Sequence, residues 1–381
     1  MTPSDGTAVP AAGRTDFAGY LFAHFVGEDA PDAEQLYLAV SEGDSLTEWS
    51  VLAAGEPVLR SDVGTGALRD PFVLRLEGDA GFVLLATDLQ VYGTGHFRDA
   101  QERGSTALLV WHSADLVTWT GPARIEVVDP AVAGNAWAPE AHWVAELGRY
   151  AVYWASNLYP ADAAPRDVRD SYNRMMIATT ADFATFTQPE VWIDVRRGAG
   201  YGTIDSAVVK RGEWYHRFTK DERPDLMQVF HERSRDLLLP THASIGSAWE
   251  LVGEQLGSEH LTHAEGPIVV PSISDDRWYL LLDWPPYGGG TGYVLFETDD
   301  LDAGRWERVE PALPPRFRHG AVIPITADED RRLRAAFAPA VSPHARTAAA
   351  LVPEFRYDAA PNDAAPSPDI TAYDTEQRAS S

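Results

Sequence analysis

Short apolar runs separated by turn-forming residues dominate the chain, and their length predicts strands rather than helices. Runs of about 5 residues, rich in aromatic, β-branched and aliphatic side chains, follow turn-forming stretches such as Glu77–Gly81 and Lys210–Gly212. Examples of these runs are Phe82–Ala86, Tyr150–Trp154, Trp214–Phe218 and Trp278–Leu282. Because strands joined by such turns pair as antiparallel hairpins, the pattern predicts an all-β protein.

Two sets of landmarks recur along the chain and indicate a repeated unit. Acidic or histidine motifs follow one another at intervals of 70, 65, 60 and 54 residues: Asp70 in RDPF, Glu140 in WAPE, Asp205 in TIDS, Glu265 in AEGP and His319 in RHG. Aromatic residues at the end of a Ser/Thr-rich turn recur at 70, 67, 63 and 57 residues: Trp49, Trp119, Phe186, Trp249 and Trp306. Five units of four strands predict a five-bladed β-propeller.

The repeat begins and ends out of phase, which predicts how the propeller closes. The strand-like run Tyr20–Phe25 precedes the first polar motif, whereas Gly320–Thr326 follows the last motif and has no unit after it. We therefore expect Gly320–Thr326 to form the innermost strand of the N-terminal blade and to leave no open edge. The propeller is assigned to residues 18–340, with a flexible segment at 1–17 and an extension at 341–381 that is largely disordered from about residue 358.

Composition narrows the possible partners and the available chemistry. The formal net charge of −26 argues against nucleic acid and against an anionic membrane surface, both of which require clustered Lys and Arg. There is no cysteine, which excludes disulfides, a thiol nucleophile and thiolate metal sites. The same net charge favours a neutral ligand. Neither a signal peptide nor a long apolar span is recognisable, so a cytoplasmic location is expected. The oligomeric state is left open.

The propeller geometry predicts where the polar residues meet. Inner strands begin around the axis at one face, so residues at equal phase converge on one pocket: Asp70, Glu140, Asp205, Glu265 and His319. Second strands return to the same face and place Asp88, Asn157, Lys220 and Asp283 near the rim. We assign substrate contacts to Trp137, Glu140, Asn157, Arg217, Asp88 and Arg318.

Several carboxylates around an aromatic-lined cleft suit glycoside hydrolysis. One carboxyl group must be protonated to serve the leaving oxygen, and another must be ionised to activate water. Flat faces among the 12 tryptophans can stack on sugar rings, although most tryptophans of such a chain are core residues. Simpler roles stay open for two acids: Asp70 precedes Pro71 and could start a turn, and Glu140 could be a structural or substrate-positioning group.

The motifs RDPF, WAPE, TIDS and EGP, in this order, resemble glycoside hydrolase family 43 over about residues 18–330. The resemblance implies five-bladed propellers that cleave arabinose- and xylose-containing glycans with inversion. It implies that Asp70 is the general base, Glu265 the general acid and Asp205 the third carboxylate that orients the acid. It also implies that His319 helps to hold calcium or a water cluster on the axis. Ser206 stands where the family usually has proline after the aspartate.

The expected function is therefore an inverting glycosidase that releases terminal arabinofuranose and needs no cofactor beyond a candidate axial calcium. A β-xylosidase or an endo-arabinanase of the same fold is the alternative within the class. A phosphorylase would need a basic phosphate site, whereas the pocket motifs supply mainly carboxylates. A catalytically silent glycan-binding propeller would be expected to lack one of the three carboxylates, and none is missing.

Overall fold

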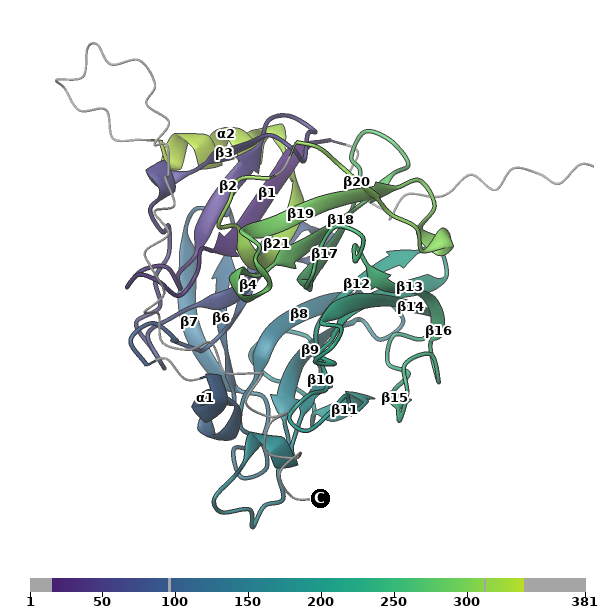
Figure 1. Cartoon of the computed structure of the whole chain (residues 1–381). Helices are drawn as coiled ribbons and strands as arrows, with labels where there is room; N and C mark the ends of the chain where they lie inside the picture. Colours follow the sequence, from purple (N-terminus) through teal and green to yellow (C-terminus); the bar gives the residue numbers. More distant parts are fainter. Residues whose placement is uncertain (1–15, 95–96, 312, 339–381) are drawn as a thin grey trace, which may run out of the picture.

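The structure, a computed structural model, describes residues 16–94, 97–311 and 313–338, and these form five sheets around one axis (Figure 1). From the axis outward, blade 1 contains β21 (Arg318–Thr326), β1 (Phe17–Phe25), β2 (Tyr37–Ser41) and β3 (Trp49–Val51). Blade 2 contains β4 (Arg69–Arg75), β5 (Phe82–Thr87), β6 (Ala107–Ser113) and β7 (Trp119–Glu126). Blade 3 contains β8 (Trp137–Val144), β9 (Arg149–Asn157), β10 (Asn173–Thr180) and β11 (Glu190–Asp194), and it gains β15 (Thr241–His242) as a parallel outer strand.

The remaining two blades complete the circle. Blade 4 contains β12 (Thr203–Arg211), β13 (Trp214–Asp221), β14 (Gln228–Ser234) and β16 (Glu250–Leu256). Blade 5 contains β17 (Glu265–Pro271), β18 (Trp278–Trp284), β19 (Gly292–Thr298) and β20 (Glu307–Arg308). The inner strands contact one another in a closed circuit, β21 to β4, β8, β12, β17 and back to β21. The five-bladed propeller predicted from the sequence is therefore confirmed.

Short helices occupy some of the connections, and the sequence analysis did not predict them. Among the described residues, the α-helices are α1 (Phe97–Arg103) and α2 (Ala327–Ala336), and the 3₁₀ turns are η1 (Ala53–Gly55), η2 (Glu77–Asp79), η3 (Val168–Asp170), η4 (Pro286–Gly288) and η5 (Leu301–Ala303). The α2 helix begins with a capping box in which the Thr326 hydroxyl accepts from the Glu329 backbone N–H. Glu329 also binds Arg75 of β4 at 2.8 Å, which ties α2 to the neighbouring blade.

Closure of the ring follows the expected route. The β21 strand pairs antiparallel with β1, from Gly320 opposite His24 to Thr326 opposite Phe17. The last strand in the described sequence is thus the innermost strand of the first blade, as predicted for Gly320–Thr326. The inner edge of blade 1 consequently has a paired neighbour on its outer side and contacts with β4 and β17 on either flank.

Apolar side chains fill each junction between blades, which explains why the strand sequences are continuous apolar runs. All six residues of β5 are buried, because alternate side chains face blade 1 and blade 3. Separate buried clusters lie between blades 1 and 2, 2 and 3, 3 and 4, 4 and 5, and 5 and 1. A strand covered on both faces has no polar side, so it does not show period-two alternation.

The aromatic landmarks also acquire a structural meaning. Trp49 and Trp119 are the first residues of the outermost strands β3 and β7, and Phe186 bridges to Thr180 at the corresponding place of blade 3. They mark the return of the chain into the outer strand of each blade. The expectations for residues 1–15 and for the segment after 338 lie outside the described residues. Within the described ranges, no helix has the length and apolarity needed to cross a membrane.

Several histidines are enclosed by the blades and are held neutral by burial. Burial lowers the pKa of His24 and of His216 to about 4. His24 stacks on Phe317 with ring centroids 4.1 Å apart, and the Nδ1 of His216 lies 2.9 Å from Nε2 of His231. An unfolded histidine takes up a proton near pH 6.5, so the unfolded chain binds more protons than the native protein below that pH. The contribution of these histidines to native stability is therefore lost as pH drops from about 6.5 towards 4.

We expect His24→Gln to reduce this acid sensitivity, since glutamine can still donate to the Phe25 carbonyl but does not titrate. The melting temperature of the variant should decline less than that of the parent between about pH 7 and pH 5. Each histidine contributes at most about 1.4 kcal/mol per pH unit. The exposed His260→Gln is the control and should follow the parent; a parallel decline in His24→Gln would contradict the assignment.

Candidate active site

Each inner strand begins with a β-bulge, and these bulges aim side chains at the axis. The strand registers shift at Arg69/Phe72, Trp137/Glu140, Ile204/Ser206, Glu265/Ile268 and opposite His24/Phe25. Asp70 and Asp205 adopt left-handed backbone conformations with φ of +49° and +56°. Such backbone costs about 1 kcal/mol or more and recurs where a side chain must be re-aimed at a functional site. Ser206, in place of the usual proline, leaves this geometry intact at Asp205.

The bulges correct the expectation that five motif residues share one phase. Ala138 and Gly266 have φ of +49° and +48° and occupy the place of Asp70 and Asp205 in blades 3 and 5. Glu140 therefore lies two residues beyond the bulge position, and Glu265 lies one residue before it. The spacing of the motifs did not reveal this offset, because each motif carries a glutamate close to its proline: Glu140 directly follows Pro139, and Glu265 stands two residues before Pro267.

Asp70 is held by one neighbouring strand and faces a histidine from another blade. The Thr87 hydroxyl donates to Asp70 Oδ2 at 2.7 Å, and the same hydroxyl accepts from the Ala138 backbone N–H at 2.8 Å. The other carboxylate oxygen, Oδ1, lies 3.5 Å from Nδ1 of His319. One oxygen is thus fixed by the protein, while the other faces the axial group.

Asp205 lies on the other side of the same imidazole. Its Oδ1 is 3.8 Å from His319 Nδ1, and its Oδ2 accepts from the Gly266 backbone N–H at 3.2 Å. Burial raises the pKa of Asp205, with the nearby His319 and Lys220 opposing the shift. A Cβ at Gly266 would lie 2.7 Å from Cγ of His319, so the glycine backs directly onto the imidazole. Asp205 therefore holds the backbone next to Glu265.

Glu265 has the densest set of donors among the three carboxylates. Arg318 Nη2 donates to Oε1 at 3.0 Å, while Lys220 Nζ and the Tyr287 hydroxyl donate to Oε2 at 2.7 and 2.5 Å. Arg318 is itself held by Asp283, whose Oδ2 accepts from Nε at 2.8 Å. Burial alone would raise the pKa of Glu265, but the charges of Lys220 and Arg318 and these hydrogen bonds lower it below its ordinary value. These contacts favour the ionised form of Glu265.

Glu140 occupies a more enclosed position on the axis. The Tyr153 hydroxyl donates to its Oε2 at 3.4 Å, and the side chain is 8% exposed. Burial raises the pKa of Glu140 well above its ordinary value, and the negative charge of Asp205 adds to this effect. A neutral carboxyl group here suits a positioning role, one of the two roles that the sequence left open.

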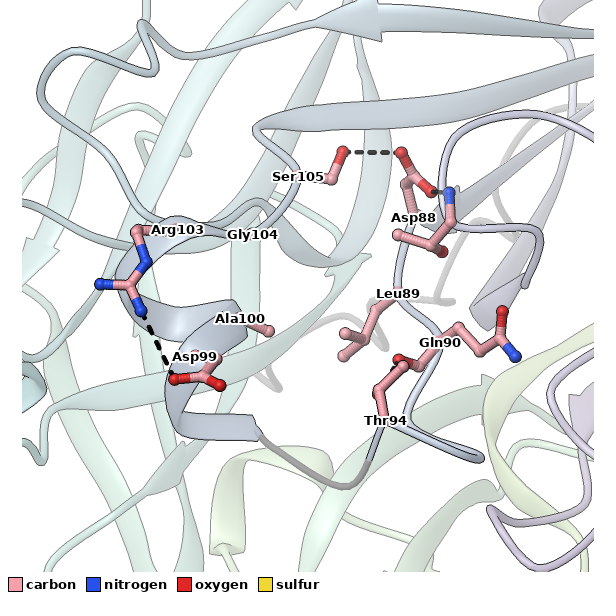
Figure 2. A pocket seen from close by; sticks show the side chains of 10 residues that line it. Asp88, Leu89, Gln90, Thr94, Asp99, Ala100, Arg103, Gly104 and Ser105 are labelled. Atoms are coloured by element: carbon pink, nitrogen blue, oxygen red, sulfur yellow. Dashed lines mark hydrogen bonds and ion pairs between the residues drawn. The ribbon is translucent and has the colours of Figure 1, made fainter.

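Asp88 lies one residue beyond the position that faces the axis. Thr87 points towards Asp70, so its neighbour points away along the alternation of the strand. The Asp88 carboxylate accepts from the Thr65 backbone N–H at 2.7 Å, the Ser105 hydroxyl at 2.7 Å and Arg124 Nε at 3.0 Å. Asp88 is one of the residues that line a hollow of about 210 Å³ next to α1. Figure 2 shows its carboxylate turned towards Ser105. In the structure Asp88 thus connects the loop at Thr65 with Ser105 and with Arg124 of β7.

Arg217 lies inside the molecule rather than in the substrate site. Its side chain is fully buried, and its guanidinium lies 4.5 and 4.1 Å from the rings of Trp192 and Trp249. Glu232 accepts from its Nη2 at 2.6 Å. Arg217 stands in the middle of β13, where the strand alternation turns it into the junction with blade 3. We therefore no longer expect it to contact a ligand.

Trp137 and Asn157 stay near the axial end of blade 3. Trp137 immediately precedes the bulge residue Ala138, is 8% exposed and packs edge-on to Phe97. Asn157 ends β9; its backbone N–H donates to Asn135, whereas its side-chain amide has no protein partner although it is fully buried. Both substrate assignments stay predictions.

The site contains groups that the sequence analysis did not assign. Tyr287 stands in the η4 turn between β18 and β19, directly before the glycine-rich stretch Gly288–Gly292. Arg69 precedes Asp70, donates to Glu34 at 2.7 Å and to Glu28 at 2.8 Å, and has no repeat signal of its own. A tyrosine in an irregular loop gives no periodic signal, and only its position beside a glycine run could have drawn attention to it.

The described residues offer limited support for the axial calcium. The Nδ1 of His319 lies 3.5 and 3.8 Å from the carboxylates of Asp70 and Asp205, and no cluster of three or more His, Asp or Glu side chains with metal-binding geometry occurs within 16–94, 97–311 and 313–338. Calcium normally takes six to eight oxygen ligands. A water-held ion beside His319 stays a prediction, and no step below depends on it.

Fold and site together define the class: a closed five-bladed propeller with a carboxylate cluster at one end of its axis, the arrangement of a glycoside hydrolase. A family profile described as "Probable glycosyl hydrolase domain", related to glycoside hydrolase family 43, matches residues 15–331. The chain belongs to this family.

A named relative agrees with this family assignment, and a solved structure agrees with the fold. The chain is 34% identical over 280 residues to a protein named alpha-L-arabinofuranosidase from Bifidobacterium longum subsp. longum, covering 67% of this chain and 26% of the relative. The chain thus spans about a quarter of that relative. A putative exo-beta-1,3-galactanase from Bifidobacterium bifidum s17 superposes with a TM-score of 0.50 at 13% identity, covering 78% of this chain and 90% of that one. The latter likeness supports the fold alone.

The new position of Arg217 leads to a stability prediction. Arg217→Met should lower the free energy of unfolding by about 3–5 kcal/mol, because Glu232 would be left as an unpaired buried charge. The KM of the folded fraction should not change. Denaturant unfolding and steady-state kinetics measure both quantities. Arg235→Met, at an exposed arginine near the outer end of blade 4, is the control; a raised KM with normal stability in Arg217→Met would return the residue to the substrate site.

Proposed function

We propose that this protein releases terminal α-L-arabinofuranosyl groups from arabinose-containing oligosaccharides by hydrolysis with inversion. The proposal rests on the position of three carboxylates at one end of the axis. His319 lies between Asp70 and Asp205, and Asp205 accepts from the backbone N–H of Gly266, the residue next to Glu265. The relative named alpha-L-arabinofuranosidase supports the choice of sugar, although this chain matches only part of it.

Asp70 is the proposed general base. Its Oδ2 is held by Thr87, and its Oδ1, which lies 3.5 Å from His319 Nδ1, is the proposed acceptor of a proton from a water molecule beside the anomeric carbon. That water attacks the carbon as the bond to the leaving oxygen breaks. Inversion needs room for the water between the two catalytic carboxyl groups, whose separation should be about 6.5–9.5 Å.

Glu265 is the proposed general acid, and Asp205 is the proposed positioning carboxylate. A proton carried by Glu265 passes to the leaving-group oxygen, while the proton from the attacking water goes to Asp70. The Asp205 bond to Gly266 fixes the backbone that carries the acid. Glu140 and Trp137, at the same end of blade 3, are proposed to contact the sugar.

The alternatives differ in substrate rather than in the catalytic carboxylates. A β-xylosidase or an endo-arabinanase would use the same carboxylates, and a panel of nitrophenyl arabinofuranosides and xylosides together with linear arabinan distinguishes the three. A silent glycan-binding propeller would bind oligosaccharides without turnover of any of them. The expected cytoplasmic location and the absence of nucleic-acid and membrane partners stay predictions.

Asp70→Asn should reduce kcat by at least about 10²–10⁴-fold on every substrate, because the amide cannot take the proton from the attacking water. The parent should release the anomer opposite in configuration to its substrate, which ¹H NMR of the first product detects. The exposed Asp44→Asn is the control and should keep full activity. Retention of configuration, or a covalent glycosyl-enzyme, would refute the single-displacement mechanism.

Glu265→Gln should discriminate between leaving groups. A nitrophenolate leaves with little help from an acid, whereas a sugar alkoxide needs the proton. The kcat/KM of the variant should therefore fall far more on an arabino-oligosaccharide than on the nitrophenyl glycoside. Equal losses on both substrates would assign Glu265 another role.

A further inference from the structure

The donors around Glu265 conflict with its proposed role unless one of them moves. A general acid must be protonated when the substrate is bound, but Arg318, Lys220 and Tyr287 all donate to this carboxylate. Hydrogen bonds to a carboxylate, and two of them from cations, favour its ionised form. At least one of these contacts must therefore break on the way to the reactive complex.

Arg318 and Lys220 are firmly built into the propeller. Arg318 is 5% exposed, begins β21 and also binds Asp283. Lys220 is 7% exposed and lies within β13, opposite Ile204 in the register with β12. Moving either cation would break strand-borne contacts and leave buried charges unpaired.

Tyr287 differs from Arg318 and Lys220 in its exposure to solvent and in the number of polar contacts that hold its side chain. It is 48% exposed, and its hydroxyl group has two polar neighbours within the described residues, Lys220 Nζ at 3.1 Å and Glu265 Oε2 at 2.5 Å. The backbone beside it is held, since the Gly288 carbonyl accepts from Trp284 Nε1 at 2.9 Å. The Tyr287 ring also lies edge-on to His263, with ring centroids 5.6 Å apart, so rotation of the side chain breaks this contact and the two hydroxyl contacts but leaves the turn in place.

We propose that the Tyr287 hydroxyl occupies the position of the leaving-group oxygen in the free enzyme, and that the substrate displaces it. This inference rests on the proposed hydrolysis. The phenol oxygen lies beside Glu265 as a glycosidic oxygen must, so it marks where the bond to the leaving group is broken. When the phenol leaves, Glu265 loses a donor and takes one proton from solvent; it then gives that proton to the leaving oxygen. Tyr287 is a positioning residue that controls access to the acid.

Tyr287→Phe tests the inference, because it removes the competing hydroxyl and keeps the ring. We expect kcat/KM on an arabino-oligosaccharide to rise about fivefold, the value of one typical hydrogen bond. On a nitrophenyl arabinofuranoside, which needs little protonation, kcat/KM should change less than about twofold. The basic limb of the pH profile on the oligosaccharide should move to higher pH.

The chain offers a matched control at another Lys–Tyr–Glu contact. The Tyr215 hydroxyl lies 2.9 Å from Lys210 Nζ and 3.4 Å from Glu146 Oε2, at the ends of β12 and β13 opposite to the active site. Tyr215→Phe should leave both substrates and the pH profile unchanged. An equal fall on both substrates in Tyr287→Phe, or no change on either, would overturn the inference.

A second measurement tests the contact between the Tyr287 hydroxyl and Glu265 in the free enzyme, and it does not depend on turnover. Titration of ¹³C-labelled glutamate side chains by NMR, with Glu265→Gln to assign the signal, should show that the Glu265 carboxyl group gains a proton at higher pH in Tyr287→Phe than in the parent. An unchanged titration would overturn the inference. If the parent cleaved no glycoside in the panel, the proposed function would fail, whereas this titration would still report on the contact.

Discussion

The antiparallel pairing of β21 with β1 is the interaction on which the rest of the site depends. It closes the ring, and it also brings Arg318 and His319, which are far from every other site residue in sequence, to the start of the innermost strand of blade 1. Arg318 then reaches Glu265, and His319 reaches Asp70 and Asp205. Fold closure and assembly of the carboxylate cluster are therefore the same structural event.

Opposite charges and buried neutral acids balance one another within this cluster. Arg318 and Lys220 compensate the negative charge of Glu265, while burial favours the neutral forms of Asp205 and Glu140. A ring of acids at one axial end would otherwise repel itself strongly in a poorly hydrated environment. The protein separates the proton affinities of its carboxyl groups by surroundings rather than by residue type, as acid–base enzymes do.

Sequence alone predicted the features that repeat and missed those that depend on local register. The closing strand and the place of Asp70 and Asp205 follow from period and phase. Asp88 illustrates the limit: one residue of uncertainty at the end of β5 decides whether a side chain faces the axis or the neighbouring loop. Arg217 shows the same limit in mid-strand, where alternation turns it between Trp192 and Trp249.

The close approach of Gly266 to His319 has a consequence for how the site can change over evolution. The equivalent bulge positions in three other blades hold Asp70, Ala138 and Asp205 at similar φ, so the contact with the imidazole, rather than the backbone conformation, calls for glycine here. A Cβ at Gly266 would lie 2.7 Å from Cγ of His319, the imidazole that stands between Asp70 and Asp205. Because Gly266 also follows Glu265 directly, a single nucleotide change at this codon would disturb the contacts of His319 with its two carboxylates without replacing any of them.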